Sequence, residues 1–220
     1  MPRYALIFAN GVARDGVMVQ RALAKSSTAL VIAADGGARL AWQSFDLKPD
    51  VIIGDMDSLT ADELDTFRSH GAQIERHNPE KDATDLELAL LWAVEHDAAC
   101  IRIIGGTGGR MDQTFGNVYL LAMPELIGRD VKLVAGEQQL WLARPGEHHI
   151  NGEANDTLSL IPLSGDVENI RTENLYYPLS GETLRFGPAR GMSNVLTTST
   201  ATVSFDAGLL LIVHTYGTPA

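Results

Sequence analysis

The sequence predicts an α/β domain followed by an all-β domain, with the boundary near residue 136. Before this point, short β-rich runs alternate with longer amphipathic stretches, a pattern typical of βαβ units around a mostly parallel, Rossmann-like sheet. After it, short β-rich runs are broken by Gly, Pro and Asn and show no helical period. The 220 residues suffice for two domains, which we place at 1–136 and 137–220.

The elements of the first domain follow from its apolar runs. We expect strands at 4–9, 29–34, 50–53, 72–76, 100–104 and 131–135. Between them we expect helices at 15–25, 37–45, 61–70, 85–97 and 112–123, the last stopped by Pro124.

Two of these helices begin with a Thr followed three residues later by Glu. Thr60 with Glu63, and Thr84 with Glu87, both match the capping box, in which each side chain bonds the other residue's backbone N–H. The second helix is expected to bury one face, made of Leu86, Leu90, Ala93 and Val94.

The second domain is predicted to be antiparallel. Its best strands are 157–161, 175–177, 201–205 and 209–213, with a turn at 206–208 between the last two. A domain of about eighty residues buries too little surface to be stable on its own. We therefore expect this domain to pack on the first one or on a second subunit.

Composition narrows the class of function. The chain has 17 Lys and Arg against 28 Asp and Glu, a formal charge of −11, which repels nucleic-acid backbones but not a nucleotide bound with Mg²⁺ at one local site. A single cysteine excludes a disulfide framework and a zinc site of several thiolates. Its apolar runs are too short for a bilayer and its start lacks a signal peptide's apolar region, so we expect a cytoplasmic protein.

A first acidic pair follows the strand at 50–53. Asp55 and Asp57 stand two apart after Gly54, at the sheet edge where open α/β sheets bind ligands. Carboxylate oxygens suit Mg²⁺, whereas the alternative for an isolated D-x-D is a solvated acidic turn.

A second acidic group precedes the helix at 85–97. Lys81, Asp82 and Asp85 place one cation and two carboxylates within five residues, which fits a site holding both phosphate and metal. The alternative is a helix N-terminus carrying acids that favour its dipole.

The most specific phosphate signal is the glycine-rich run at 105–112, which follows a strand and opens a helix. Gly106, Gly108 and Gly109 let backbone N–H groups approach an anion, Arg110 offers a two-pronged phosphate contact, and Asp112 either orients Arg110 or joins the outer shell of a metal. The run is neither a Walker A nor a G-x-G-x-x-G fingerprint, so the sheet is not a classical Rossmann domain. Alternatively, it is a glycine turn whose Arg and Asp pair at the helix start.

A fourth strand end, at Asp35, Gly36 and Gly37, repeats the pattern of glycines at a βα junction. A parallel sheet brings its strand C-termini to one edge, so four such junctions support one another.

In their joint order these motifs resemble the bacterial thiamine pyrophosphokinase family across nearly the whole chain. The resemblance rests on Asn10-Gly11, 35–38, 49–50 leading into 54–58, 79–85, 105–112 with Asn117, and 191–194. It implies a C-terminal β-sandwich that binds thiamine and forms a homodimer, with active sites where the subunits meet. It also implies transfer of the terminal diphosphate of ATP to the hydroxyethyl oxygen of thiamine with Mg²⁺, which gives thiamine diphosphate and AMP.

The resemblance also implies roles for single residues. Asp55, Asp57 and Asp85 match Mg²⁺ positions, with Asp82 beside them. Nucleotide contacts fall to Asp35, Gly36, Gly37, Lys81, Gly106, Gly108, Gly109 and Arg110, with Asp112 in the same loop, and thiamine contacts to Ser193 and Asn194. No general base is identified, and the thiamine proton goes either to a carboxylate such as Asp55 or Asp57 or to solvent.

Two positions depart from the family pattern. Asn174 stands where relatives commonly have Gly in Thr-x-Gly-Leu, and we expect the turn to persist because Asn tolerates positive φ. Val195 stands where an acidic residue often follows the Ser-Asn pair. Two other functions stay open: diphosphate transfer to a pterin alcohol (6-hydroxymethyl-dihydropterin), and nucleotide or thiamine binding without catalysis.

Overall fold

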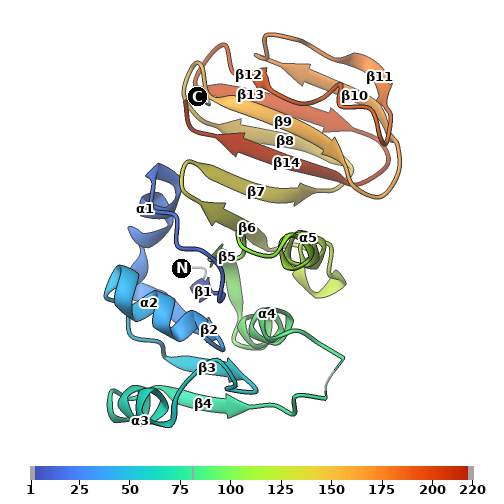
Figure 1. The fold of residues 1–220 in the computed structure, drawn as a ribbon. Coiled ribbons are helices and arrows are strands. Elements are labelled where there is room, and N and C mark those ends of the chain that lie inside the picture. The colour runs from blue at the N-terminus through green and yellow to red at the C-terminus, as the bar shows by residue number, and fades with distance from the viewer. Residues whose placement is uncertain (1–2, 81, 218–220) are drawn as a thin grey trace. The chain divides into compact units, whose positions relative to one another are not determined.

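The computed structural model describes residues 3–80 and 82–217 (Figure 1). The chain divides after Gly136 into two compact units. Within the described ranges, no helix is long and apolar enough to cross a membrane.

The first unit is built on a parallel sheet in the order β6-β5-β1-β2-β3-β4. The bounds are β1 Arg3–Phe8, β2 Leu30–Ala34, β3 Val51–Gly54, β4 Gln73–Arg76, β5 Ala98–Ile104 and β6 Asp130–Ala135. The chain adds β2 to β4 on one side of β1 and then β5 and β6 on the other. The strand order therefore reverses between β1 and β5, which is where doubly wound sheets open a crevice at their carboxyl ends.

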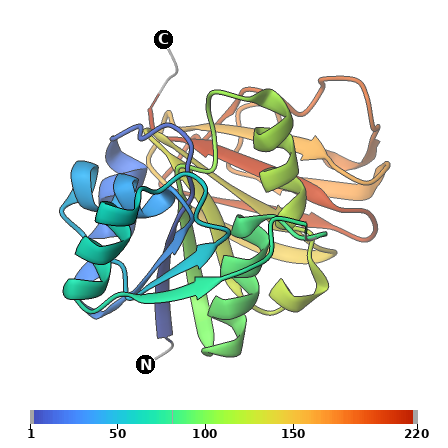
Figure 2. The same ribbon diagram turned by 60° about the horizontal axis from the view of Figure 1, so that its bottom comes forward.

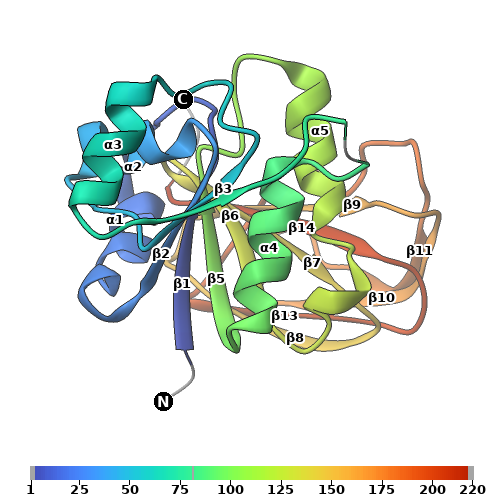
Figure 3. The same cartoon turned by 90° about the horizontal axis from the view of Figure 1, so that it is seen from below.

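Helices cover both faces of this sheet, as Figures 2 and 3 show. They are α1 Val17–Leu23, α2 Gly37–Phe45, α3 Ala61–Ser69, α4 Asp85–Glu95 and α5 Met111–Leu120, with 3-10 turns at Ser26–Thr28 and Pro124–Leu126. Leu6 and Phe8 pack toward α1 and α2, while Ile52 packs in a second cluster with α3. Successive side chains of a strand point to opposite faces of the sheet. Both faces are buried here, so the strand sequences are apolar almost without interruption.

The predicted strands and helices of this unit are all present, with ends that differ by a few residues. At α3, Thr60 and Glu63 form both bonds of the capping box. At α4 the capping-box prediction is wrong in one half, because among the described bonds Thr84 accepts from the Glu87 N–H without the reciprocal bond. Val94 is partly exposed, and Ala89 takes its place on the buried face.

The second unit contains two antiparallel sheets, β12-β9-β14-β7 and β11-β10-β13-β8. The bounds are β7 Gln138–Ala143, β8 Gly146–Asn151, β9 Thr157–Pro162, β10 Val167–Glu173, β11 Ser180–Leu184, β12 Asn194–Val195, β13 Thr200–Phe205 and β14 Leu210–Thr215. Leu158 and Ile212 from one sheet share a core with Ile170 and Val203 from the other. The unit is therefore a β-sandwich, as predicted.

Two predictions for this unit are wrong. Residues 175–177 form no strand, since β10 ends at Glu173 and Leu175 makes only an isolated bridge to Leu196. The turn at 206–208 closes no hairpin, because β13 and β14 belong to different sheets. Strands β7, β8, β10, β11 and β12 were not predicted. In β10 polar residues alternate with apolar ones, because one of its faces points away from the core, and β12 has only two residues.

Candidate active site

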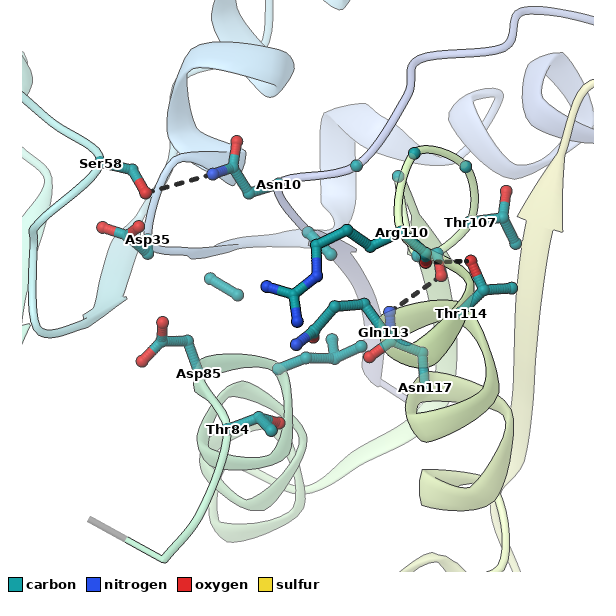
Figure 4. Close-up of a pocket in the computed structure, with 18 of the residues that line it drawn as sticks. Asn10, Asp35, Ser58, Thr84, Asp85, Thr107, Arg110, Gln113, Thr114 and Asn117 are labelled. Atoms are coloured by element: carbon teal, nitrogen blue, oxygen red, sulfur yellow. Dashed lines mark hydrogen bonds between the residues drawn. The ribbon is translucent and has the colours of Figure 1, made fainter. Parts of the chain in front are cut away.

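A cavity of about 700 Å³ opens in the first unit at the carboxyl ends of β1, β2, β3 and β5 (Figure 4). It lies at the point where the strand order reverses. Its lining comes from the loops that follow these strands, from the segment before α4 and from the first turns of α4 and α5. The volume falls in the range of small-molecule sites.

One side of the cavity is acidic. Asp35, Asp55 and Asp57 each present a carboxylate oxygen, and these oxygens lie within 4.8 Å of one another. Side chains of the loop after β3 point in different directions. Those of Met56 and Leu59 are buried in the core. Packing of these two apolar side chains leaves the flanking carboxylates at the cavity.

Gly54 makes room for a fourth carboxylate. A Cβ atom placed on Gly54 would lie 3.0 Å from Asp35 Cβ and 3.0 Å from Asp85 Cγ. Asp85 opens α4 and lines the cavity, and Figure 4 shows it on the same side as Asp35. Any larger residue at position 54 would fill the space between the two carboxylates.

The acidic group carries the features of a cation site. Asp35 is buried, and its Oδ1 has no hydrogen-bond partner within the part of the chain that the structure describes. Burial raises the pKa of Asp35, hydrogen bonds from Ser58 and from the Gly36 backbone lower it in part, and the nearby Asp85 and Asp57 carboxylates raise it further. Hard oxygen donors gathered around a buried carboxylate with one unpartnered oxygen among the described residues fit Mg²⁺.

The other side of the cavity is the glycine loop between β5 and α5. Gly11 N–H donates to Gly105 O at 2.9 Å, and Asn117 Nδ2 donates to Gly106 O at 2.8 Å. A Cβ on Gly11 would lie only 2.2 Å from Gly105 O, so glycine is required for this approach. The loop leads directly into the first turn of α5, whose N–H groups have no acceptor within the helix.

Arg110 stands at the mouth of this loop. It is the N-cap residue of α5, and its guanidinium extends into the cavity (Figure 4). Its Nη2 lies 2.5 Å from Asp112 Oδ2 in an exposed ion pair. Hydrogen bonding between the two groups raises the pKa of Arg110 and lowers that of Asp112, so both stay charged. Asp112 is not among the cavity-lining residues and reaches the site through Arg110.

Other predicted residues lie away from the cavity lining. Gly37 allows α2 to start tightly against β1, since a Cβ there would lie 1.9 Å from Phe8 O, whereas a Cβ on Gly36 would lie 2.5 Å from the side chain of Asn10, which itself lines the cavity. Asp82 is exposed in the segment before α4. Lys81 lies outside the described residues.

The sequence interpretation missed two polar residues of α5. Gln113 and Thr114 line the cavity one turn after Arg110, and Asn117 follows one turn later. The sequence did contain a signal for these residues, because polar residues spaced three and four positions apart lie on one face of a helix.

In the second unit, Ser193 and Asn194 differ in exposure. Ser193 is exposed, with φ 56°, and its N–H donates to Ser159 Oγ at 3.0 Å. Asn194 is buried; its Oδ1 accepts from the Tyr177 N–H at 3.0 Å and its Nδ2 donates to Tyr177 O at 2.7 Å. Both ends of the Asn194 amide are therefore used to hold the backbone at Tyr177.

Models of known protein families match both units of the chain. The model of the thiamin pyrophosphokinase catalytic domain matches residues 21–134. The chain belongs to the thiamin pyrophosphokinase family. The family's vitamin B1 binding domain matches residues 147–210, within the β-sandwich unit.

Individual relatives agree with this membership. A thiamine pyrophosphokinase from Bacillus subtilis is 33% identical over 76% of this chain and 78% of its own length. One from Arabidopsis thaliana is 29% identical over 82% of this chain and 76% of its own length. Among solved structures, the Bacillus subtilis enzyme superimposes with a TM-score of 0.86 at 28% identity, covering 97% and 99% of the two chains. A family protein from Enterococcus faecalis gives 0.83 at 26% identity, covering 97% and 98%.

Proposed function

We propose that this chain is a thiamine diphosphokinase that uses ATP and Mg²⁺. The hydroxyethyl oxygen of thiamine attacks the β-phosphorus of ATP, the bond from that phosphorus to the oxygen shared with the α-phosphorus breaks, and AMP leaves. The products are thiamine diphosphate and AMP. The observation that supports this best is the carboxylate group around Gly54 facing a glycine loop across one cavity.

The acidic side would hold the metal. Asp55, Asp57 and Asp85, with Asp35 behind them, offer the oxygen ligands. When bound, Mg²⁺ neutralises charge on the phosphates and favours the in-line geometry that phosphoryl-type transfer needs. The proton of the thiamine hydroxyl goes to solvent or to a carboxylate such as Asp55 or Asp57.

The glycine loop would hold the phosphates of the nucleotide. Gly106, Gly108 and Gly109 line the cavity just before α5, where backbone N–H groups without side chains beside them can approach a phosphate, and Arg110 adds a two-pronged charged contact. Arg110 must exchange Asp112 for a phosphate, which its exposed position allows. Asp112 would orient the guanidinium until the phosphate replaces it, and Gly37 places α2 against β1 rather than touching the nucleotide.

The β-sandwich would bind thiamine. The exposed Ser193 hydroxyl is the direct polar contact, while Asn194 fixes the segment of Tyr176 and Tyr177, whose rings are exposed. Membership of the family favours a homodimer with active sites between subunits. Light scattering that gives a dimer mass would support this assembly, and a monomer mass would count against it.

The deciding experiment follows the phosphorus NMR spectrum of the purified protein with ATP, Mg²⁺ and thiamine. AMP with thiamine diphosphate is the expected outcome, and a parallel sample without thiamine should release no AMP. Release of ADP would mean transfer of a single phosphate and contradict the proposal. If no product forms, a pterin alcohol replaces thiamine in the same assay, and calorimetry then asks whether the chain only binds its ligands.

A further inference from the structure

Arg39 is a cation placed where elementary electrostatics disfavours one. It lies in the first turn of α2, which begins at Gly37, and the positive end of a helix dipole repels a cation there. It is not among the residues that line the cavity. Its position therefore needs a compensating partner.

That partner is Glu63 on α3. Arg39 Nε lies 2.7 Å from Glu63 Oε1 and Nη2 lies 2.8 Å from Oε2, a two-pronged ion pair. Glu63 Oε2 also accepts from the Thr60 N–H at 2.9 Å, within the capping box of α3. The bond from Arg39 and those from Thr60 lower the pKa of Glu63 to about 2 and keep the carboxylate charged.

The same guanidinium reaches the acidic loop. Arg39 Nη2 donates to the backbone O of Ser58 at 3.0 Å. Ser58 Oγ donates to Asp57 Oδ1 at 3.1 Å and accepts from Asn10 Nδ2 at 3.2 Å (Figure 4 shows the latter bond). A fixed Ser58 backbone thus fixes a hydrogen-bond donor to one of the cavity carboxylates.

Arg39 also connects two arms of the site. Its helix starts two residues after Asp35, whereas Glu63 and Ser58 belong to the segment that carries Asp55 and Asp57. One side chain therefore links the two loops whose carboxylates must stay within 4.8 Å of each other.

We propose that Arg39 is a positioning residue of the transfer reaction, holding Glu63 and the Ser58 carbonyl so that the Asp55 and Asp57 carboxylates keep their distance from Asp35. The role rests on the proposed function, in which these carboxylates bind the divalent cation. Met56 and Leu59 already bury the loop through packing, so Arg39 sets orientation more than stability.

The test measures cation binding directly, with Mn²⁺ as the probe. The free Mn²⁺ signal in electron paramagnetic resonance gives its dissociation constant for wild type, Arg39→Gln and Arg39→Lys, without any turnover. Substitution of an outer-shell partner of a metal ligand typically changes metal affinity by about 10- to 100-fold. We therefore expect Arg39→Gln to bind Mn²⁺ at least about tenfold more weakly than the wild type, with a smaller loss in Arg39→Lys. Arg68→Gln is the matched control, because Arg68 makes an exposed ion pair with Asp65 on α3 away from the cavity.

Turnover gives the second readout. We expect the half-saturating Mg²⁺ concentration to rise in Arg39→Gln while the Michaelis constant for thiamine stays constant, and Glu63→Gln to behave similarly without adding to the effect in the double variant. Unchanged Mn²⁺ affinity in folded Arg39→Gln overturns the inference, as does a loss confined to thermal stability. If Arg39→Gln does not fold, the same criteria apply to Arg39→Lys.

The two proposals fail separately. A wild-type protein that binds Mn²⁺ but makes no AMP contradicts the proposed reaction, and the Mn²⁺ titrations still decide the role of Arg39. An active wild type whose Arg39 variants keep wild-type Mn²⁺ affinity contradicts Arg39 positioning alone.

Discussion

The two sides of the cavity are built by different means. The acidic side is fixed before any ligand arrives, by Met56 and Leu59 in the core and by the bonds of Ser58. The glycine-loop side is fixed in its backbone by Gly11 and Asn117, but its charged group, Arg110, lies exposed and is paired with Asp112.

The difference follows from what each side must bind. Several carboxylates close together repel one another and keep their arrangement only if the fold imposes it. A phosphate is held by many weak contacts from backbone N–H groups, and one long side chain can move to complete them. We therefore expect substitutions on the acidic side to abolish chemistry and those at Arg110 to weaken nucleotide binding.

The largest effect is expected from Asp57→Asn. Removing one charge from the proposed metal ligands should lower kcat by about 10³-fold or more, equivalent to about 4 kcal/mol of transition-state stabilisation. Mg²⁺ with nucleotide should raise the unfolding temperature of the wild type and not that of the variant. Asp65→Asn, at an exposed carboxylate of α3, is the control. Full activity in a folded Asp57→Asn would contradict the metal assignment.

Gly54→Ala tests the acidic side by filling the space between carboxylates, without removing a charge. The new methyl group would lie 3.0 Å from both Asp35 Cβ and Asp85 Cγ, and φ is 153°. We expect weaker Mn²⁺ binding, a fall in kcat of about 100-fold and a loss of about 1–3 kcal/mol in unfolding free energy.

Gly71→Ala separates backbone strain from filling of the site. Gly71 has φ 95° and nothing within 4 Å of an added Cβ. This control should lose stability and keep activity; equal loss of activity in both variants would show that strain alone explains Gly54.

Arg110→Gln probes the other side. We expect the Michaelis constant for ATP to rise about tenfold with a smaller change in kcat, the loss expected for one charge-assisted contact. Because the Arg110–Asp112 pair is exposed, the unfolding temperature should not change. A loss of Mn²⁺ affinity in the absence of nucleotide would contradict the division of the cavity into two sides.

The smallest effect is expected in the pH dependence of stability, through Glu63, which pairs with Arg39 and so supports the acidic side. The pKa of Glu63 in the folded protein is about 2, below its ordinary value of 4.5, so folding favours the charged form. Its contribution to stability is complete above about pH 4.5 and is lost as the pH falls toward 2. Glu63→Gln should therefore be less stable than the wild type at pH 7, by an amount that shrinks over this window in urea unfolding. A difference that stays constant with pH would show that the carboxylate charge is not the source.

The elements that sequence patterns predicted best are those whose signal is local. The apolar strands of the first unit and the Thr60 cap carry their own explanation in neighbouring residues. Asn174 has φ 59°, so the expected turn persists without Gly. Predictions failed where the outcome depends on distant partners: residues 175–177 have strand-forming composition, yet β10 ends before them.

By itself, the sequence determined that acids and glycines follow successive strands of a parallel sheet, because strand and turn preferences are local. Only the tertiary structure decided which of them meet. Asp35 joined the carboxylate group because β2 pairs beside β3, whereas Gly37 lies against β1 and Gly36 against the Asn10 side chain. Arg39 and Glu63 stand 24 residues apart. Their pairing depends on how two helices pack, and no spacing along the chain encodes it.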